Sequence, residues 1–245
     1  MINAVDKNKL KQGDRVKGNT HEDVKTSSII ENLLLLPDEM VINILRDSIG
    51  NRATLPKNMG KINFFEFWPS WNGRFTTKKV RVEPDVFIRF ENCGLIIEAK
   101  RDVNAEQFIE QWLNEFSGCR NEYGSFENVY LIALDGKSDD MQGYSDENLK
   151  EIWNISRSEY NAIRERIDKC SWMNLLQSVR KERIGVGENY LNRIFDQIEL
   201  AFEINGIVHV DWMKDSHLDG FEISEQSIKD MNNWYNLNKK WYGNK

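Results

Sequence analysis

Apolar positions along the chain form short strand-like runs and longer helical stripes, which together predict an α/β fold. Runs typical of strands lie at 62–68, 76–82, 86–88, 95–97 and 128–135. Helical spacing, with boundaries such as Thr20 as an N-cap and Pro37 as a stop, predicts helices at 20–36, 37–49, 105–116, 156–169, 171–181, 190–204 and from Ser224 onward. This order predicts a central mixed sheet flanked by helices, with a mostly helical C-terminal part.

Charged residues stand at the ends of the two runs at 86–88 and 95–97. Asp85 precedes the first run, and Glu98 and Lys100 follow the second. Side chains alternate between the two faces of a strand, so Glu98 and Lys100 share a face while Ala99 faces away. The turn-forming residues between the runs predict a β-hairpin.

The length of the hairpin turn decides where Asp85 lies. If Asn92-Cys93 or the whole of 91–94 forms the loop, Asp85 lies opposite Lys100 and diagonal to Glu98, at about 7–8 Å between backbones. A three-residue loop would move Asp85 to the other face. With either of the first two loops, two carboxylates can close on one divalent cation.

Two carboxylates and a lysine suit the chemistry of phosphodiester hydrolysis. Mg²⁺ prefers oxygen ligands and keeps several waters, so one or two carboxylates can hold it against a phosphate. The metal polarises a phosphoryl oxygen and lowers the pKa of a bound water. A lysine beside the metal can orient or deprotonate that water, or stabilise charge on the phosphorane. We therefore expect Mg²⁺ or Mn²⁺ as the cofactor.

The pair Pro84-Asp85, followed by Glu98-Ala99-Lys100 at the end of an apolar run, resembles the PD-(D/E)XK nuclease superfamily. The resemblance covers about residues 20–135 and implies a restriction-endonuclease-like core. It implies that Asp85, Glu98 and the backbone carbonyl of Ala99 bind metal and that Lys100 is catalytic. The alternative interpretation is a surface hairpin with a Glu98–Lys100 salt bridge. Against it, the run at 95–97 is apolar on both faces, which suits a central strand covered by helices.

The helix expected at 20–36 places Glu22 at the head of an apolar stripe that continues through Ile29 and Leu33. The resemblance implies a third acid on the first helix, near the metal. Glu22 fits that catalytic and metal-binding role better than Glu31, which projects to the opposite side. The alternative is an ordinary first-turn acid favoured by the helix dipole.

The helix expected after Lys100 would begin at Asn104 as N-cap and would place Gln107 and Gln111 one turn apart on one face. Several branches of the superfamily carry a glutamine on this helix, often followed four residues later by tyrosine. Here the fourth residue is Gln111, which leaves the branch open. We expect Gln107 in the catalytic set and Gln111 at the nucleic acid; a polar helix face is the alternative.

Composition narrows the class of protein. The chain has 245 residues, 40% of them hydrophobic, which is enough for one large core, or one core with a small subdomain. We expect no membrane association, because no apolar run approaches the length of a membrane span. Three widely spaced cysteines form neither a disulfide framework nor a zinc pattern, which favours a cytoplasmic location.

The formal net charge of −6 is not typical of a DNA-binding protein, so nucleic acid would have to bind through local basic patches. Lys78, Lys79 and Arg81 lead directly into Asp85 and are the strongest candidates. The tryptophans Trp68 and Trp71 flank a turn. They could stack on unpaired bases or pin that turn to the core, and we favour the core. Further basic candidates are Lys7, Lys9, Lys11, Arg15, Lys17, Arg180, Lys181 and Arg183.

These patterns predict a basic N-terminus at 1–19, a nuclease core at 20–135 and a helical extension at 136–245. The leading hypothesis is a metal-dependent nuclease acting on DNA in restriction, phage defence or repair. The alternatives are a catalytically inactive subunit of this fold that binds DNA or protein, and a small-molecule or RNA hydrolase on the same scaffold. No ATP-hydrolysis motif is visible, so unwinding would need a separate ATPase, helicase or defence-system partner. A homodimer is a further expectation.

Overall fold

The computed structural model describes residues 22–50, 54–125, 127–138, 143–187 and 189–207. The predictions for the basic N-terminus, for Thr20 as a helix cap and for a helix from Ser224 lie outside these residues. In the described part of the chain, no helix is long and apolar enough to span a membrane.

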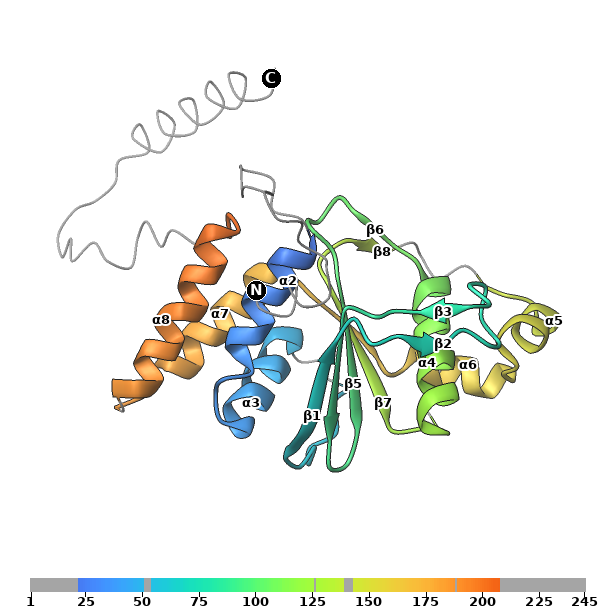
Figure 1. Cartoon of the computed structure of the whole chain (residues 1–245), viewed down its shortest axis with the longest axis horizontal. Helices are drawn as coiled ribbons and strands as arrows, with labels where there is room; N and C mark the ends of the chain where they lie inside the picture. The colour runs from blue at the N-terminus through green and yellow to red at the C-terminus, as the bar shows by residue number, and fades with distance from the viewer. Residues whose placement is uncertain (1–21, 51–53, 126, 139–142, 188, 208–245) are drawn as a thin grey trace, which may run out of the picture. The chain divides into compact units, whose positions relative to one another are not determined.

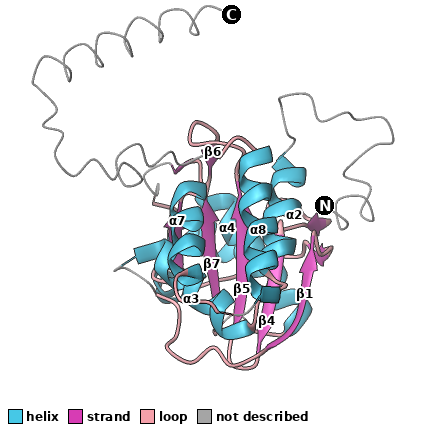
Figure 2. Ribbon diagram, turned by 90° about the vertical axis from the view of Figure 1, so that its left-hand side faces the viewer, coloured by secondary structure: helices cyan, strands magenta, loops and turns pink. Residues whose placement is uncertain are grey.

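A five-stranded mixed sheet in the order β1-β4-β5-β7-β9 forms the centre of the fold (Figures 1 and 2). Strands β1, β4 and β5 pair antiparallel, and β5, β7 and β9 pair parallel. The strands span Ile62–Phe67 (β1), Val86–Phe90 (β4), Gly94–Ala99 (β5), Val129–Leu134 (β7) and Ile167–Cys170 (β9). The predicted mixed sheet is therefore confirmed.

Alternation along the strands divides the apolar residues between two cores. Val86 and Ile97 belong to the core on one face of the sheet. Phe87 and Ile96 belong to the core on the other face. Both faces of the central strands are thus buried, as the apolar run at 95–97 predicted. The same alternation assigns Asp85 and Glu98 to the second face.

Helices cover both faces of the sheet (Figure 1). The first face packs against α2 (Glu22–Leu33), α3 (Asp38–Ile49), α7 (Trp172–Arg183) and α8 (Asn189–Ile204). The second face packs chiefly against α4 (Ile109–Tyr123), joined by α5 (Asp146–Asn148), the π-helical turn η2 (Leu149–Trp153) and α6 (Arg157–Arg164). Figure 2 shows α2, α3, α7 and α8 lying over the strands of the first face.

Two small sheets flank the central one. The strands β2 (Trp71–Asn72) and β3 (Arg81–Val82) form an antiparallel pair. The strands β6 (Glu106–Gln107) and β8 (Lys137–Ser138) form a parallel pair. The strand expected at 76–82 is therefore reduced to its last two residues. Trp68 and Trp71 are 3% and 2% exposed, so they pin this region to the core as favoured.

Several helix boundaries differ from the sequence prediction. The first described helix, α2, ends at Leu33, and turns replace the helix expected up to Leu36. The helix expected at 156–169 ends at Arg164, because the following residues enter the central sheet as β9. The part of the chain expected to be a helical extension thus contributes a strand to the sheet. The capping box of Ser156 and Glu159 is confirmed.

Candidate active site

The hairpin of β4 and β5 turns one residue earlier than the expected two-residue loop at Asn92-Cys93. Phe90 N donates to Cys93 O at 2.8 Å, which closes a two-residue turn at Glu91-Asn92. The resulting register pairs Val86 with Ile97. Continuing this register by one residue on each strand places Asp85 beside Glu98. The expected position of Asp85 opposite Lys100 is wrong by two residues. The face is unchanged, because a shift of two residues preserves the alternation of side chains.

Lys100 forms ion pairs with Glu98 and Glu22. Its Nζ lies 2.7 Å from Glu98 Oε1 and 3.7 Å from Glu22 Oε1, and its side chain is 13% exposed. Burial alone would lower the pKa of Lys100, but the charge and hydrogen bond of Glu98 and the charges of Glu22 and Asp85 together raise it above its usual value. Lys100 is therefore a firmly charged ammonium group.

Asp85 is fixed by two donors before β4 begins. Its Oδ2 accepts from Ala99 N at 2.8 Å, and its Oδ1 accepts from Trp68 Nε1 at 3.2 Å. Burial raises the pKa of Asp85 well above its usual value, and the neighbouring charge of Glu98 adds to the increase. Burial thus favours the neutral form of Asp85, and a cation bound beside it would favour the charged form.

Glu22 reaches the site from the first turn of α2. Its Oε2 accepts from Arg101 N at 2.8 Å. Burial raises the pKa of Glu22, while the ammonium of Lys100 opposes that shift. The structure therefore brings together Glu22, Asp85, Glu98 and Lys100, as the sequence predicted.

The helix after β5 begins later than expected, and this changes the roles of the two glutamines. Helix α4 starts at Ile109, so Asn104 is not its cap and Gln107 lies on β6. Gln107 is buried, donates to Asp135 O at 2.7 Å and accepts from Trp112 Nε1 at 3.0 Å. The structure does not bring Gln107 to the carboxylates, and its bonds hold the β6 segment in place.

Gln111, which was expected at the nucleic acid, lies beside Glu98, whereas Gln107, which was expected in the catalytic set, does not. Gln111 Nε2 donates to Glu98 Oε1, the same oxygen that accepts from Lys100. Two donors therefore orient one oxygen of Glu98. The other oxygen, Oε2, is buried and has no hydrogen-bond partner among the described residues.

Glu115 is a fourth acid that the sequence analysis missed. It lies one turn after Gln111 on α4 and is 1% exposed, and neither of its oxygens accepts from a donor group of the described structure, although its carboxyl group is within hydrogen-bond reach of Glu98. Burial raises the pKa of Glu115 well above its usual value, and the adjacent Glu98 adds to this. With the helix starting at Ile109, the i, i+4 spacing from Gln111 was the signal that would have found it.

Side chains of α2 and α7 donate hydrogen bonds to the backbone that follows β5. Lys25 Nζ donates to Arg101 O at 2.7 Å, and Trp172 Nε1 donates to Lys100 O at 2.9 Å. Lys25 is itself buried and lies 4.8 Å above the Trp172 ring. These contacts fix the main chain at Lys100, and sequence reasoning missed them because they join the backbone after β5 to helices far away in the chain.

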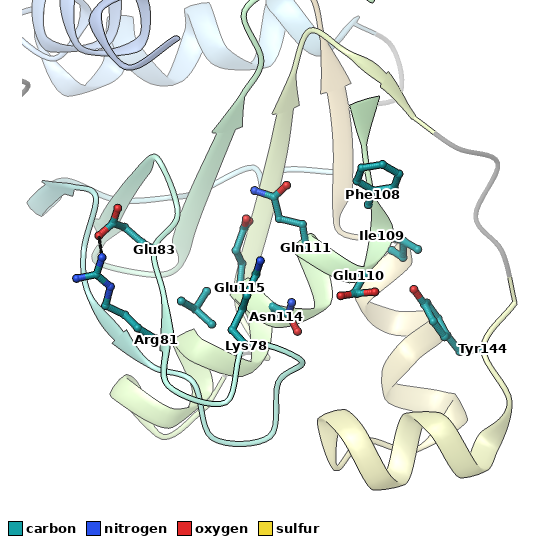
Figure 3. Close-up of a pocket in the computed structure, with 11 residues that line it drawn as sticks. Lys78, Arg81, Glu83, Phe108, Ile109, Glu110, Gln111, Asn114, Glu115 and Tyr144 are labelled. Carbon is teal, nitrogen blue, oxygen red and sulfur yellow. Dashed lines mark ion pairs between the residues drawn. The ribbon is translucent and has the colours of Figure 1, made fainter. Parts of the chain in front are cut away.

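Two of the three expected basic residues border a cavity beside the acids. Lys78 and Arg81 line a cavity of about 830 Å³ that also reaches Gln111 and Glu115 (Figure 3). Arg81 forms a 3.0 Å ion pair with Glu83. Lys79 is exposed, and the cavity lining does not include it.

The donor set fits a hard divalent cation. Carboxylate oxygens are the ligands that Mg²⁺ prefers, and Glu98 Oε2 is a buried carboxylate oxygen to which no donor group of the described structure is bonded. A group of three or more acid, histidine or cysteine side chains already arranged as ligands was not found among the described residues. A cation held chiefly by Asp85 and Glu98, with water completing its shell, agrees with both observations.

Comparisons with known proteins add two weak structural similarities. No family model matches the chain, and no curated protein matches it. The crystal structure of a protein of unknown function, AF1548, aligns with 58% of this chain and 85% of its own, at 11% identity and a TM-score of 0.30. The small subunit of the heterodimeric restriction endonuclease R.BspD6I aligns with 75% of this chain and 97% of its own, at 13% identity and a TM-score of 0.25.

Proposed function

We propose that the chain is a metal-dependent nuclease that hydrolyses phosphodiester bonds of DNA, in restriction, phage defence or repair. The observation that carries the proposal is the joint placement of Asp85, Glu98 and Lys100 at one end of the β4–β5 hairpin, beside a cavity bordered by basic residues. Asp85, Glu98 and the carbonyl of Ala99 would hold the metal, with Glu22 next to them.

The excess of acids argues against a purely structural salt bridge. Four carboxyl groups act electrostatically on Lys100 or lie within reach of its charge: Glu22, Asp85, Glu98 and Glu115. Burial and the neighbouring acids raise the pKa values of Asp85 and Glu115, so these carboxyl groups are crowded around one ammonium group beyond what a single ion pair requires. A structural pair would be served by one acid, whereas a cation site needs the surplus.

Each group has a distinct task in this proposal. A bound Mg²⁺ or Mn²⁺ would polarise the phosphoryl oxygen and lower the pKa of a water. Lys100 would stabilise the negative charge that develops on the phosphorane, or orient or deprotonate the attacking water. Gln111 orients Glu98, and Trp68 and the Ala99 amide orient Asp85. The carboxylates of Glu98, Glu22 and Asp85 raise the pKa of Lys100 in the metal-free site, and a cation bound by them would offset that increase, so all three roles of the lysine stay open.

The test is cleavage of plasmid and single-stranded DNA by the full chain with Mg²⁺ or Mn²⁺ and with a chelator. We expect cleavage only with metal and a fold that survives the chelator. Lys100→Met keeps most of the side-chain stem and should lower the cleavage rate by about 10²–10⁴. Lys61→Met is the matched control, since Lys61 is exposed and precedes β1 at the opposite end of the hairpin.

Binding must be measured beside cleavage, in chelator and at fixed salt, because affinity for DNA depends steeply on salt. Lys100→Met should bind nearly as the parent does, and its thermal unfolding should remain cooperative. Cleavage in the presence of chelator, or equal rates for Lys100→Met and Lys61→Met, would contradict the proposal. Parallel loss of binding and cleavage would make Lys100 a phosphate anchor instead.

A further inference from the structure

The cavity beside the four acids has two chemically different sides. Figure 3 shows the rings of Phe108 and Tyr144 on one side and Arg81 on the other, with Gln111 and Glu115 between them. Its volume of about 830 Å³ lies within the range of small-molecule and cofactor sites, about 300–1,000 Å³. The middle of the cavity therefore adjoins the candidate metal ligands.

Phe108 is an exposed aromatic ring in an unusual place. It occupies the extended position immediately before α4 and is 42% exposed. Single exposed apolar side chains are common, and Phe64 and Phe65 are similarly exposed, so what distinguishes Phe108 is its place in the cavity lining. Tyr144 is half-buried, with its ring packed 4.9 Å from the Trp153 ring. The ring of Phe108 is thus open to solvent, whereas the ring of Tyr144 is held by its contact with Trp153.

The basic side of the cavity is anchored to the same helix. Thr77 N donates to Asn114 Oδ1 at 3.0 Å, and Thr77 Oγ1 donates to Glu110 Oε1 at 2.8 Å. Lys78 follows directly and is exposed. These bonds fix the loop that carries Lys78 against α4, so the cation and Phe108 belong to one rigid frame.

The charges of the cavity favour a phosphate at one place. The ion pair with Glu83 offsets the charge of Arg81, and Glu110, which also lines the cavity, accepts a hydrogen bond from Thr77. Lys78 and Arg81 are both exposed, and of the two Lys78 has no ion pair with another described residue. A ligand with one phosphate and one flat ring would place the phosphate at Lys78 and the ring against Phe108.

We propose that this cavity binds an unpaired nucleotide of single-stranded DNA, with its base stacked on Phe108 and a phosphate at Lys78. The proposal rests on the nuclease function above and gives it a substrate class. Bases in a duplex are already stacked on one another, so presenting one to Phe108 would cost a few kcal/mol of unstacking. A single strand presents its bases without that cost, and aromatic stacking accepts any base.

The experiment measures binding by fluorescence anisotropy in chelator, with a labelled single-stranded DNA oligonucleotide and its blunt duplex at one salt concentration. All variants carry Lys100→Met, so that no cleavage interferes. Phe108→Ala should weaken single-strand binding about fivefold to a hundredfold, the range expected for one stacked base, and leave duplex binding unchanged. Phe108→Trp should retain single-strand affinity.

Phe65→Ala is the matched control, because Phe65 is an exposed phenylalanine of similar exposure, 44%, on β1. It should bind both DNAs as the parent does. Equal parent affinity for the two DNAs, or an equal loss on both for Phe108→Ala, would overturn the proposal. Tighter binding of RNA of the same sequence would also overturn it and assign the cavity to RNA.

The binding experiment can fail or succeed independently of the proposed nuclease function. Because the measurement uses neither metal nor cleavage, a single-strand effect of Phe108→Ala would stand even if the parent chain cut no substrate. Metal-dependent cleavage with no effect of Phe108→Ala would refute the cavity assignment and leave the nuclease in place.

Discussion

Replacing Lys25 with methionine should change how the stability of the fold depends on pH. Lys25 is 5% exposed, and its ammonium group donates to Arg101 O at 2.7 Å. Burial lowers its pKa from 10.5 to about 8, although the negative charges of Asp135, Asp102 and Glu22 partly oppose that shift. Methionine fills a similar volume without carrying a charge.

The magnitude follows from the lowered pKa. A fall from 10.5 to about 8 corresponds to about 3 kcal/mol, at about 1.36 kcal/mol per unit, and solvent screening reduces this to about 2 kcal/mol. Between pH 8 and 10.5 the unfolded chain binds more protons at Lys25 than the folded chain does. The unfolding free energy of the parent should therefore rise with pH in this window, relative to Lys25→Met.

The assay is chemical or thermal unfolding of parent and Lys25→Met at pH 7 and pH 10.5. From pH 7 to pH 10.5 the unfolding free energy of the parent should increase by about 2 kcal/mol more than that of Lys25→Met. This corresponds to a difference of about 4–8 °C in Tm for a chain of this size. Other titrating groups cancel in the difference, and the exposed-lysine variant Lys61→Met should stay parallel to the parent. If the difference in unfolding free energy between the parent and Lys25→Met changes by less than about 0.5 kcal/mol between the two pH values, Lys25 is not a buried cation.

Two further predictions concern neighbouring residues. Glu115→Gln should stabilise the metal-free fold at pH 7–8. The stabilising contribution of the raised pKa of Glu115 is present below its usual pKa of 4.5 and is lost as pH rises, so the gain over the parent should shrink toward pH 4. Denaturant titrations at both pH values measure this, and a pH-independent gain would contradict it. Gln107→Ala should destabilise the fold by about 1–3 kcal/mol, because it leaves Trp112 Nε1 without its acceptor. Gln111→Ala should instead slow cleavage at nearly unchanged stability. Unfolding and cleavage assays on both variants test this, and a destabilised Gln111→Ala together with a stable but slow Gln107→Ala would contradict it.

Strand alternation placed Glu98 and Lys100 on one face, and it added Asp85 to that face only if the turn had two or four residues. The structure has a two-residue turn and places all three residues on that face. The predicted register was nevertheless wrong by two residues, because 91–94 contains several residues that suit a turn. The error was harmless because the period of a strand is two.

Glu22 was also foreseeable, since its position at the head of an apolar stripe is a local property of one helix. The start of α4 was not. Asn104 and the residues after it have a helical pattern, yet Glu106 and Gln107 pair with Lys137 and Ser138 as strands. Pairing between segments about 30 residues apart overrode the local preference and exchanged the roles of Gln107 and Gln111.

What the chain determined by itself was therefore local: the period of each apolar run, the acids and lysine at its ends, and several helix caps. The tertiary structure alone decided which distant groups meet there. It buried Glu115 against Glu98, brought Lys25 and Trp172 to the backbone after β5, and added β9 from beyond residue 135 to the sheet. Such contacts depend on packing between elements, and no periodicity within a single element encodes them.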